Sequence, residues 1–218
     1  MPDAELGAKL DPELEAVGAG LAREAATLAG LGWMRATSGN LSAVLGRNPL
    51  RLLVTASGLD KGELTAADHV VVDESGAAIP GQSRRPSAEA ALHARVAAIS
   101  GAGAVIHVHP PVAVVAAARW PDGVDLQNLE MLKALGIPAE SRATLPVIGN
   151  SQDMTVLGDR LAAAYDPTVP AVVVADHGLY AWGAHLRQAR HHVEAVESLL
   201  QIRLGQAMLP DGAERRPR

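Results

Sequence analysis

Apolar residues recur at helical spacing in several stretches of this chain of 218 residues. Proline suits the first position of a helix, and after Pro12 the apolar residues lie three or four positions apart, which predicts a helix ending near residue 31. A helical stretch at 153–164 has a capping residue available in Ser151 or Asp153. The remaining predicted helical segments are 88–99, 111–118, 128–135 and 184–208.

Short apolar runs between turn-forming residues predict strands. These runs cover residues 41–45, 50–55, 70–72, 103–109, 171–175 and 179–182. The early ones are separated only by turns, whereas the later ones alternate with helices, so hairpins and crossovers both occur. The pattern predicts a single α/β domain of three layers, in which helices flank a central mixed, mainly antiparallel β-sheet. We expect its core to span about residues 12–208 and the polar C-terminal tail to be disordered.

Composition narrows the range of possible functions. Hydrophobic residues make up 48% of the chain and charged residues 20%, which excludes a disordered protein. A formal charge of −5 and an aromatic content of 2% argue against a nucleic-acid partner. No apolar run approaches a membrane span, and the N-terminus lacks the features of a signal peptide, so we expect a cytoplasmic protein without a membrane partner. Because the chain has no cysteine, a transition-metal site must use His, Asp or Glu.

His107 and His109 close an apolar run and are two residues apart, so on a strand their imidazoles point to the same face. His177 ends a second apolar run and is the natural third ligand of an open metal site. The alternative is a chance pair plus a hydrogen-bonded turn residue, and spacing alone does not decide between them. We expect His93 to pair locally with Glu89 or to support the site. His69, His185, His191 and His192 are expected at the surface.

Two loops combine glycine with hydroxyl side chains, Thr37-Ser-Gly-Asn40 and Thr55-Ala-Ser-Gly58, and Ser87 precedes a predicted helix. Exposed backbone N–H groups together with hydroxyls suit a phosphate dianion. Ordinary turn chemistry is the alternative. Two carboxylates lie near these features. Glu89 could simply be a favourable charge at a helix start, and Glu130 could simply form a salt bridge with Lys133.

These motifs together resemble the class II aldolase/adducin-head superfamily over about residues 12–208. The matching segments are Thr37-Ser-Gly-Asn-Leu-Ser42, Thr55-Ala-Ser-Gly58, Pro86-Ser-Ala-Glu89, His107-Val-His109 and His177-Gly178. The resemblance implies one divalent metal ion per subunit, usually zinc, held by His107, His109 and His177. It also implies a homotetramer with active sites between subunits, and a sugar-phosphate substrate. The phosphate pocket that it implies consists of Gly39, Asn40, Ser57, Gly58 and Ser87.

Two positions depart from the superfamily pattern. The residue before the third histidine, often Asn in relatives, is Asp176, and the Ser-Ser pair of the sugar-phosphate aldolases is Ser87-Ala88. Neither departure removes a metal ligand, but the second removes one hydroxyl contact and argues against the aldolase branch.

The sharper similarity is to a branch of metal-dependent lyases that dehydrate a phosphorylated methylthio-ketopentose in methionine salvage. It is carried by residues 53–61, 130–135, 145–150 and 177–183. For this reaction we expect Glu130 to be the acid–base residue, in its own or a neighbouring subunit, and Glu89 to support it near the metal. The alternatives are an aldolase that cleaves the C3–C4 bond and an adducin-like assembly module without activity.

Overall fold

The computed structural model describes residues 12–209, so the predicted disordered tail lies outside the described residues. A seven-stranded sheet forms the centre, in the order β3-β2-β1-β4-β9-β8-β7. All neighbouring strands in it are antiparallel except β7 and β8. The strands are β1 (Asn40–Arg47), β2 (Leu50–Thr55), β3 (His69–Val72), β4 (Ala104–Val108), β7 (Val147–Ile148), β8 (Ala171–Val174) and β9 (Gly178–Gly183).

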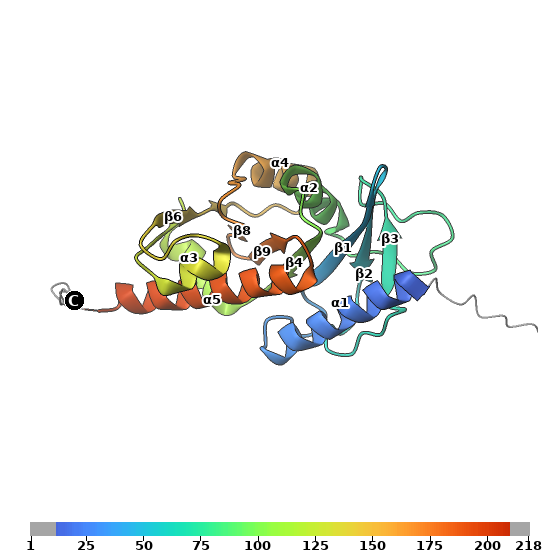
Figure 1. Cartoon of the computed structure of the whole chain (residues 1–218), viewed down its shortest axis with the longest axis horizontal. Helices are drawn as coiled ribbons and strands as arrows, with labels where there is room; N and C mark the ends of the chain where they lie inside the picture. The colour runs from blue at the N-terminus through green and yellow to red at the C-terminus, as the bar shows by residue number, and fades with distance from the viewer. Residues whose placement is uncertain (1–11, 210–218) are drawn as a thin grey trace, which may run out of the picture.

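Helices cover both faces of this sheet, as Figure 1 shows. The helices are α1 (Pro12–Gly30), α2 (Ala90–Ser100), α3 (Pro111–Arg119), α4 (Met154–Ala163) and α5 (Leu186–Ala207). Buried residues of α1, α3 and α5 form one hydrophobic cluster with one face of the sheet. Those of α2 and α4 form a second cluster with the opposite face. The predicted three-layer arrangement with a mainly antiparallel sheet is therefore confirmed.

Short elements between α3 and α4 differ from the predictions. Strands β5 (Val124–Gln127) and β6 (Arg142–Leu145) pair in a small separate sheet, and neither they nor β7 was predicted. The stretch predicted as helical at 128–135 is a 3-10 helix, η1 (Glu130–Leu135), which ends at Gly136 in the left-handed conformation. Strands β3 and β8 are equally short but carry a continuous apolar run, whereas β5 and β6 mix polar and apolar residues and β7 has only two residues.

Two histidines expected at the surface are buried instead. His192 faces inward from α5, and its Nδ1 lies 2.6 Å from the backbone oxygen of Trp182. His69 is buried at the start of β3, with Nδ1 3.2 Å from the oxygen of Ala66. Both expectations were wrong, and each ring has a backbone oxygen beside its Nδ1 that the local sequence pattern did not reveal.

Strand pairing brings distant parts of the chain to one end of the sheet. Asn40, the first residue of β1, pairs with His107 near the end of β4, and Val108 pairs with Leu179 near the start of β9. Gly178 is required at this crossing, because a Cβ there would lie 2.3 Å from the oxygen of Val108. Within residues 12–209 no helix is long and apolar enough to cross a membrane.

Candidate metal centre and active-site cleft

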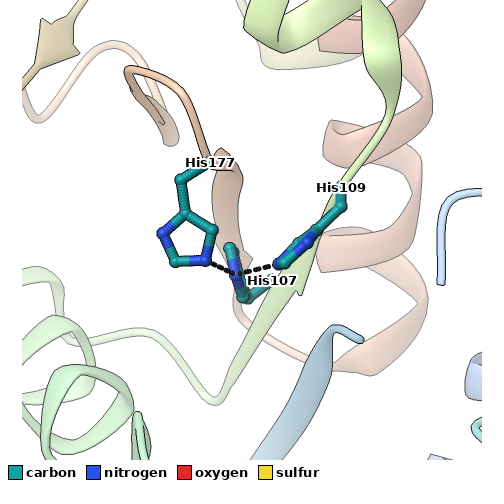
Figure 2. A group of neighbouring side chains, drawn as sticks. All are labelled: His107, His109 and His177. Carbon is teal, nitrogen blue, oxygen red and sulfur yellow. Dashed lines mark hydrogen bonds between the residues drawn. The ribbon is translucent and has the colours of Figure 1, made fainter. Parts of the chain in front are cut away.

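Three imidazoles converge where β4 ends and β9 begins (Figure 2). Nε2 of His107 lies 2.8 Å from Nε2 of His109 and 3.2 Å from Nε2 of His177. The turn before β9 carries His177 into the group, and its Asp176 has a φ of 56°. Asp and Asn are the residues other than glycine that tolerate this left-handed conformation best, which accounts for either of them at this position.

The donor set fits a divalent cation. Nδ1 of His107 donates to the backbone oxygen of Leu179 at 3.0 Å, so the lone pair of this ring is on Nε2. One lone pair cannot serve two neighbouring imidazoles at once, whereas a cation would accept one lone pair from each ring. The three ligand nitrogens lie within 4.8 Å of one another, and a tetrahedral zinc ion needs nitrogens about 3.4 Å apart. These residues could hold a divalent metal ion and leave one coordination position open.

Burial keeps His107 and His109 in the form that binds metal. It lowers the pKa of His107 well below the usual range, and the neighbouring imidazoles of His109 and His177 lower it further. Burial also lowers the pKa of His109, with His177 as the next cause. Neutral imidazoles are the metal-binding form, so both rings are ready to act as ligands at neutral pH.

Glu89 is the carboxylate that this chain brings to the three histidines. Its Oε2 lies 3.4 Å from Nε2 of His107, and its Oε1 lies 3.4 Å from Nε2 of His177. The side chain is 13% exposed, and it sits at the start of α2. Tyr180 stacks on the ring of His107 at a centroid distance of 4.0 Å. Burial, followed by the carboxylate of Glu89, raises the pKa of the Tyr180 phenol well above its usual value, so the phenol stays neutral.

A cleft of about 280 Å³ joins this cluster to the hydroxyl-rich loops. Its lining includes Glu89, His109 and His177, so the loops and the histidine cluster share one space. The structure thus brings together the residues for which sequence predicted phosphate binding. These are Gly39, Asn40, Ser57, Gly58 and Ser87. Gly39 has a φ of 73° and packs against β4, where a Cβ would lie 2.9 Å from the oxygen of His107.

Lys61 is a cleft residue to which the sequence analysis gave no role. Its Nζ donates to the backbone oxygens of Thr37 at 2.9 Å and Leu59 at 2.7 Å, and these bonds use two of the three N–H groups of the ammonium. Burial lowers the pKa of this ammonium group from its ordinary value. The sequence signal for this role was a lysine three residues after the Ser57-Gly58 turn. The Lys61 side chain places a cation in the wall of the cleft.

Glu130 lies apart from the lining of the cleft. It opens η1 with a side chain that is 79% exposed, and its Oε1 accepts a hydrogen bond from Lys133 at 2.7 Å. A salt bridge with Lys133 was the alternative role expected for Glu130 from the sequence. Within one chain the structure therefore brings Glu89, and not Glu130, to the histidine cluster.

The architecture and this site correspond to a known protein family. Residues 19–204 match the model of the class II aldolase and adducin N-terminal domain, and the chain belongs to this family. Two similar relatives are named methylthioribulose-1-phosphate dehydratase. The one from Sulfurihydrogenibium sp. is 39% identical over 78% of this chain and 81% of its own length. The one from Persephonella marina is 37% identical over 78% and 80%.

Solved structures agree with the fold. L-fuculose-1-phosphate aldolase from Thermus thermophilus superposes with a TM-score of 0.69 and 26% identity, covering 90% of this chain and 96% of its own. A sugar-phosphate aldolase from Thermotoga maritima has a TM-score of 0.67 at 19% identity, covering 91% and 99%, and bears on the fold alone.

His93 should make the protein sensitive to acid. Full burial lowers its pKa from 6.5 to about 4, against the opposing charge of Glu89. Between these values the unfolded chain binds a proton that the folded protein excludes, so stability falls as the pH falls. We expect His93 to account for about 2–3 kcal/mol of lost unfolding free energy between pH 7 and pH 4.5.

Urea unfolding of the wild type and His93→Gln at both pH values measures this contribution. The variant should lose less stability on acidification, because glutamine does not titrate. An identical loss in both proteins would show that His93 is protonated in the folded state.

Proposed function

We propose that this protein dehydrates 5-methylthioribulose 1-phosphate to 2,3-diketo-5-methylthiopentyl 1-phosphate in methionine salvage. The observation that carries the proposal is the cleft in which hydroxyl-rich loops meet a carboxylate and two of the three clustered histidines. The cleft would accommodate both functional groups of the substrate, with the phosphate at the loops and the polarised carbonyl at the histidines. The names of the two relatives supply the particular substrate.

The elimination requires two proton movements. Removal of the C3 proton next to the C2 ketone leaves an electron pair, which forms the C3–C4 double bond as the C4 hydroxyl departs as water. The resulting enol becomes the second ketone. His107, His109 and His177 would hold the metal ion, most simply zinc, and a bound divalent ion supplies Lewis acidity toward the C2 oxygen.

We propose that Glu130 moves these protons. A carboxylate can accept the C3 proton and then deliver it to the departing hydroxide. Since Glu130 is 79% exposed and outside the lining of its own cleft, it would serve the cleft of a neighbouring subunit in a homotetramer. Met131, beside it, is an exposed apolar residue that suits such a contact. Glu89 would accept a hydrogen bond from a substrate hydroxyl at the histidine cluster.

Phosphate would bind between the two loops. The backbone at Gly39 and Gly58, the hydroxyls of Ser57 and Ser87, and Lys61 line this part of the cleft. The NH2 group of Asn40 contacts Glu89, and its amide oxygen contacts His93. Asn40 would therefore contribute to phosphate binding while also holding these two side chains.

Product identity tests the proposal. Purified protein should contain bound divalent metal, and it should convert methylthioribulose 1-phosphate to the diketone without loss of carbon. The alternative with a structural observation behind it is aldol cleavage, since the fold matches sugar-phosphate aldolases. Cleavage of the C3–C4 bond would release a triose phosphate instead, and its appearance in place of the diketone would contradict the dehydratase assignment.

Ser57→Ala should weaken phosphate recognition. Ser57 is exposed in the wall of the cleft, and loss of one hydrogen bond to a charged group should raise KM about tenfold. Inhibition by inorganic phosphate should weaken by a similar factor while metal content stays normal. Ser83→Ala, at an exposed serine outside the cleft lining, is the control. If KM and phosphate inhibition both stay at wild-type values, the loop is an ordinary turn.

A further inference from the structure

A chain of polar side chains runs from the buried face of the sheet to Glu89. Ser42 Oγ lies 2.7 Å from Nδ1 of His93, and Nε2 of His93 contacts Oδ1 of Asn40. Nδ2 of Asn40 then reaches Oε2 of Glu89 at 2.6 Å. Ser42 and His93 are fully buried and Asn40 is 5% exposed, so water does not compete for these contacts.

Each hydrogen bond in this chain fixes the direction of the next. A carboxylate only accepts, so Asn40 must turn its NH2 group toward Glu89. The amide oxygen of Asn40 then faces His93, whose Nε2 must carry the proton. Nδ1 of His93 is left with the lone pair, and it accepts the hydroxyl proton of Ser42.

The other neutral tautomer of His93 would break this order. A lone pair on Nε2 would face the amide oxygen of Asn40, and two acceptors repel each other. Relief would require a flip of the amide, which would turn its oxygen toward the carboxylate of Glu89. Full burial keeps His93 neutral, and Tyr180, which packs against it at a ring-centroid distance of 5.9 Å, restricts its movement.

We propose that His93 is a positioning residue for Glu89. In its Nε2–H tautomer, with Nδ1 accepting from the hydroxyl of Ser42, it locks the Asn40 amide so that the NH2 group holds the Glu89 carboxylate between His107 and His177. These hydrogen bonds thus set the orientation of the Glu89 side chain. They originate at Ser42 and His93, which are fully buried and which no substrate reaches. The expected effect of His93 on kcat rests on the proposed dehydration, whereas the expected tautomer of its ring does not.

The tautomer can be read without any activity. In the metal-loaded protein labelled with ¹⁵N-histidine, long-range ¹H–¹⁵N spectra distinguish Nε2–H from Nδ1–H imidazoles, and His93→Gln identifies the resonance. We expect a neutral Nε2–H ring at pH 7. A neutral Nδ1–H ring or a charged ring would overturn the proposal. Ser42→Ala removes the hydroxyl at Nδ1 but leaves the amide oxygen of Asn40 to accept from Nε2–H, so the tautomer should persist, and a change to Nδ1–H would overturn the proposed order.

Kinetics then separate positioning from simple packing. In His93→Gln the new amide nitrogen can donate to Asn40, so kcat should remain near the wild-type value. His93→Leu fills the space without a donor, and we expect kcat to fall about 10–100-fold with KM and metal content unchanged. His192→Leu, at a buried histidine outside the cleft lining, is the matched control and should keep its kcat.

The outcomes are distinguishable. Equal losses of kcat in the Gln and Leu variants, or full kcat in His93→Leu, would overturn the proposal. If His93→Leu does not fold, the tautomer of the wild type decides the matter, because a neutral Nδ1–H ring or a charged ring overturns the proposal without that variant. If the wild type does not dehydrate the substrate at all, the proposed function is wrong, and the spectra still decide the state of His93.

Discussion

His109→Ala is expected to lose bound metal and turnover together while the fold stays intact. His109 contributes one of three converging nitrogens, and two imidazoles alone hold a divalent ion poorly. The loss of affinity should exceed the roughly 10–100-fold that follows removal of an outer-shell partner. Because its side chain is only half-buried, the alanine should cost little packing energy.

Elemental analysis after dialysis measures the metal, and circular dichroism checks the fold. His191→Ala removes an exposed histidine of α5 and should retain both metal and activity. His107→Ala should also lose the metal, but with lower stability, because its fully buried ring stacks on Tyr180. Full metal occupancy in His109→Ala would refute the assignment of the ligands.

Glu130→Gln is expected to lower kcat by about 10²–10⁴-fold, the usual contribution of a positioned acid–base group. Glutamine keeps the size and hydrogen-bonding capacity of the side chain but cannot carry the proton. Metal content and KM should hardly change, since Glu130 lies outside the histidine cluster. Rapid measurement of diketone formation gives kcat, and Glu89→Gln is the comparison.

A larger loss in Glu89→Gln than in Glu130→Gln would transfer the acid–base role to Glu89. Subunit mixing tests the placement separately. Inactive Glu130→Gln subunits mixed with inactive His107→Ala subunits should regain some activity, because a hybrid interface can combine one intact histidine cluster with one intact Glu130. Verified hybrids without activity would refute the placement of Glu130 across subunits. Its chemical role would then be judged from the kcat values of the single variants.

Local patterns were sufficient to predict the main elements and the shared face of His107 and His109. The strand 103–109 was predicted from its apolar run, and two residues at spacing two on a strand necessarily share a face. Convergence with His177 required more, namely the pairing of β4 with β9, which no local pattern specifies. The chemistry of the residues and the resemblance predicted the convergence of the three histidines, but not the strand pairing that produces it.

Burial of polar residues was predicted less well. His192 belongs to the inward stripe of α5 with Ala189 and Val196, so helical spacing contained the signal, but the charge of histidine favoured a surface position. Support of the site was one of two roles expected for His93, but its partners Ser42 and Asn40 could not be predicted, since they are about fifty residues away in sequence. In the proposed placement, the surroundings of Glu130 would depend on a second subunit, which a single chain does not specify.

The pairing of β4 with β9 also sets the order of events during synthesis. His107 and His177 are separated by 70 positions, and β9 itself must emerge from the ribosome before it can dock beside β4. Until then the nascent chain presents two adjacent imidazoles and no third. Full-strength metal capture by the proposed site would therefore wait until nearly the entire domain has been made, and a prematurely terminated chain that lacks β9 would compete poorly for the cell's metal.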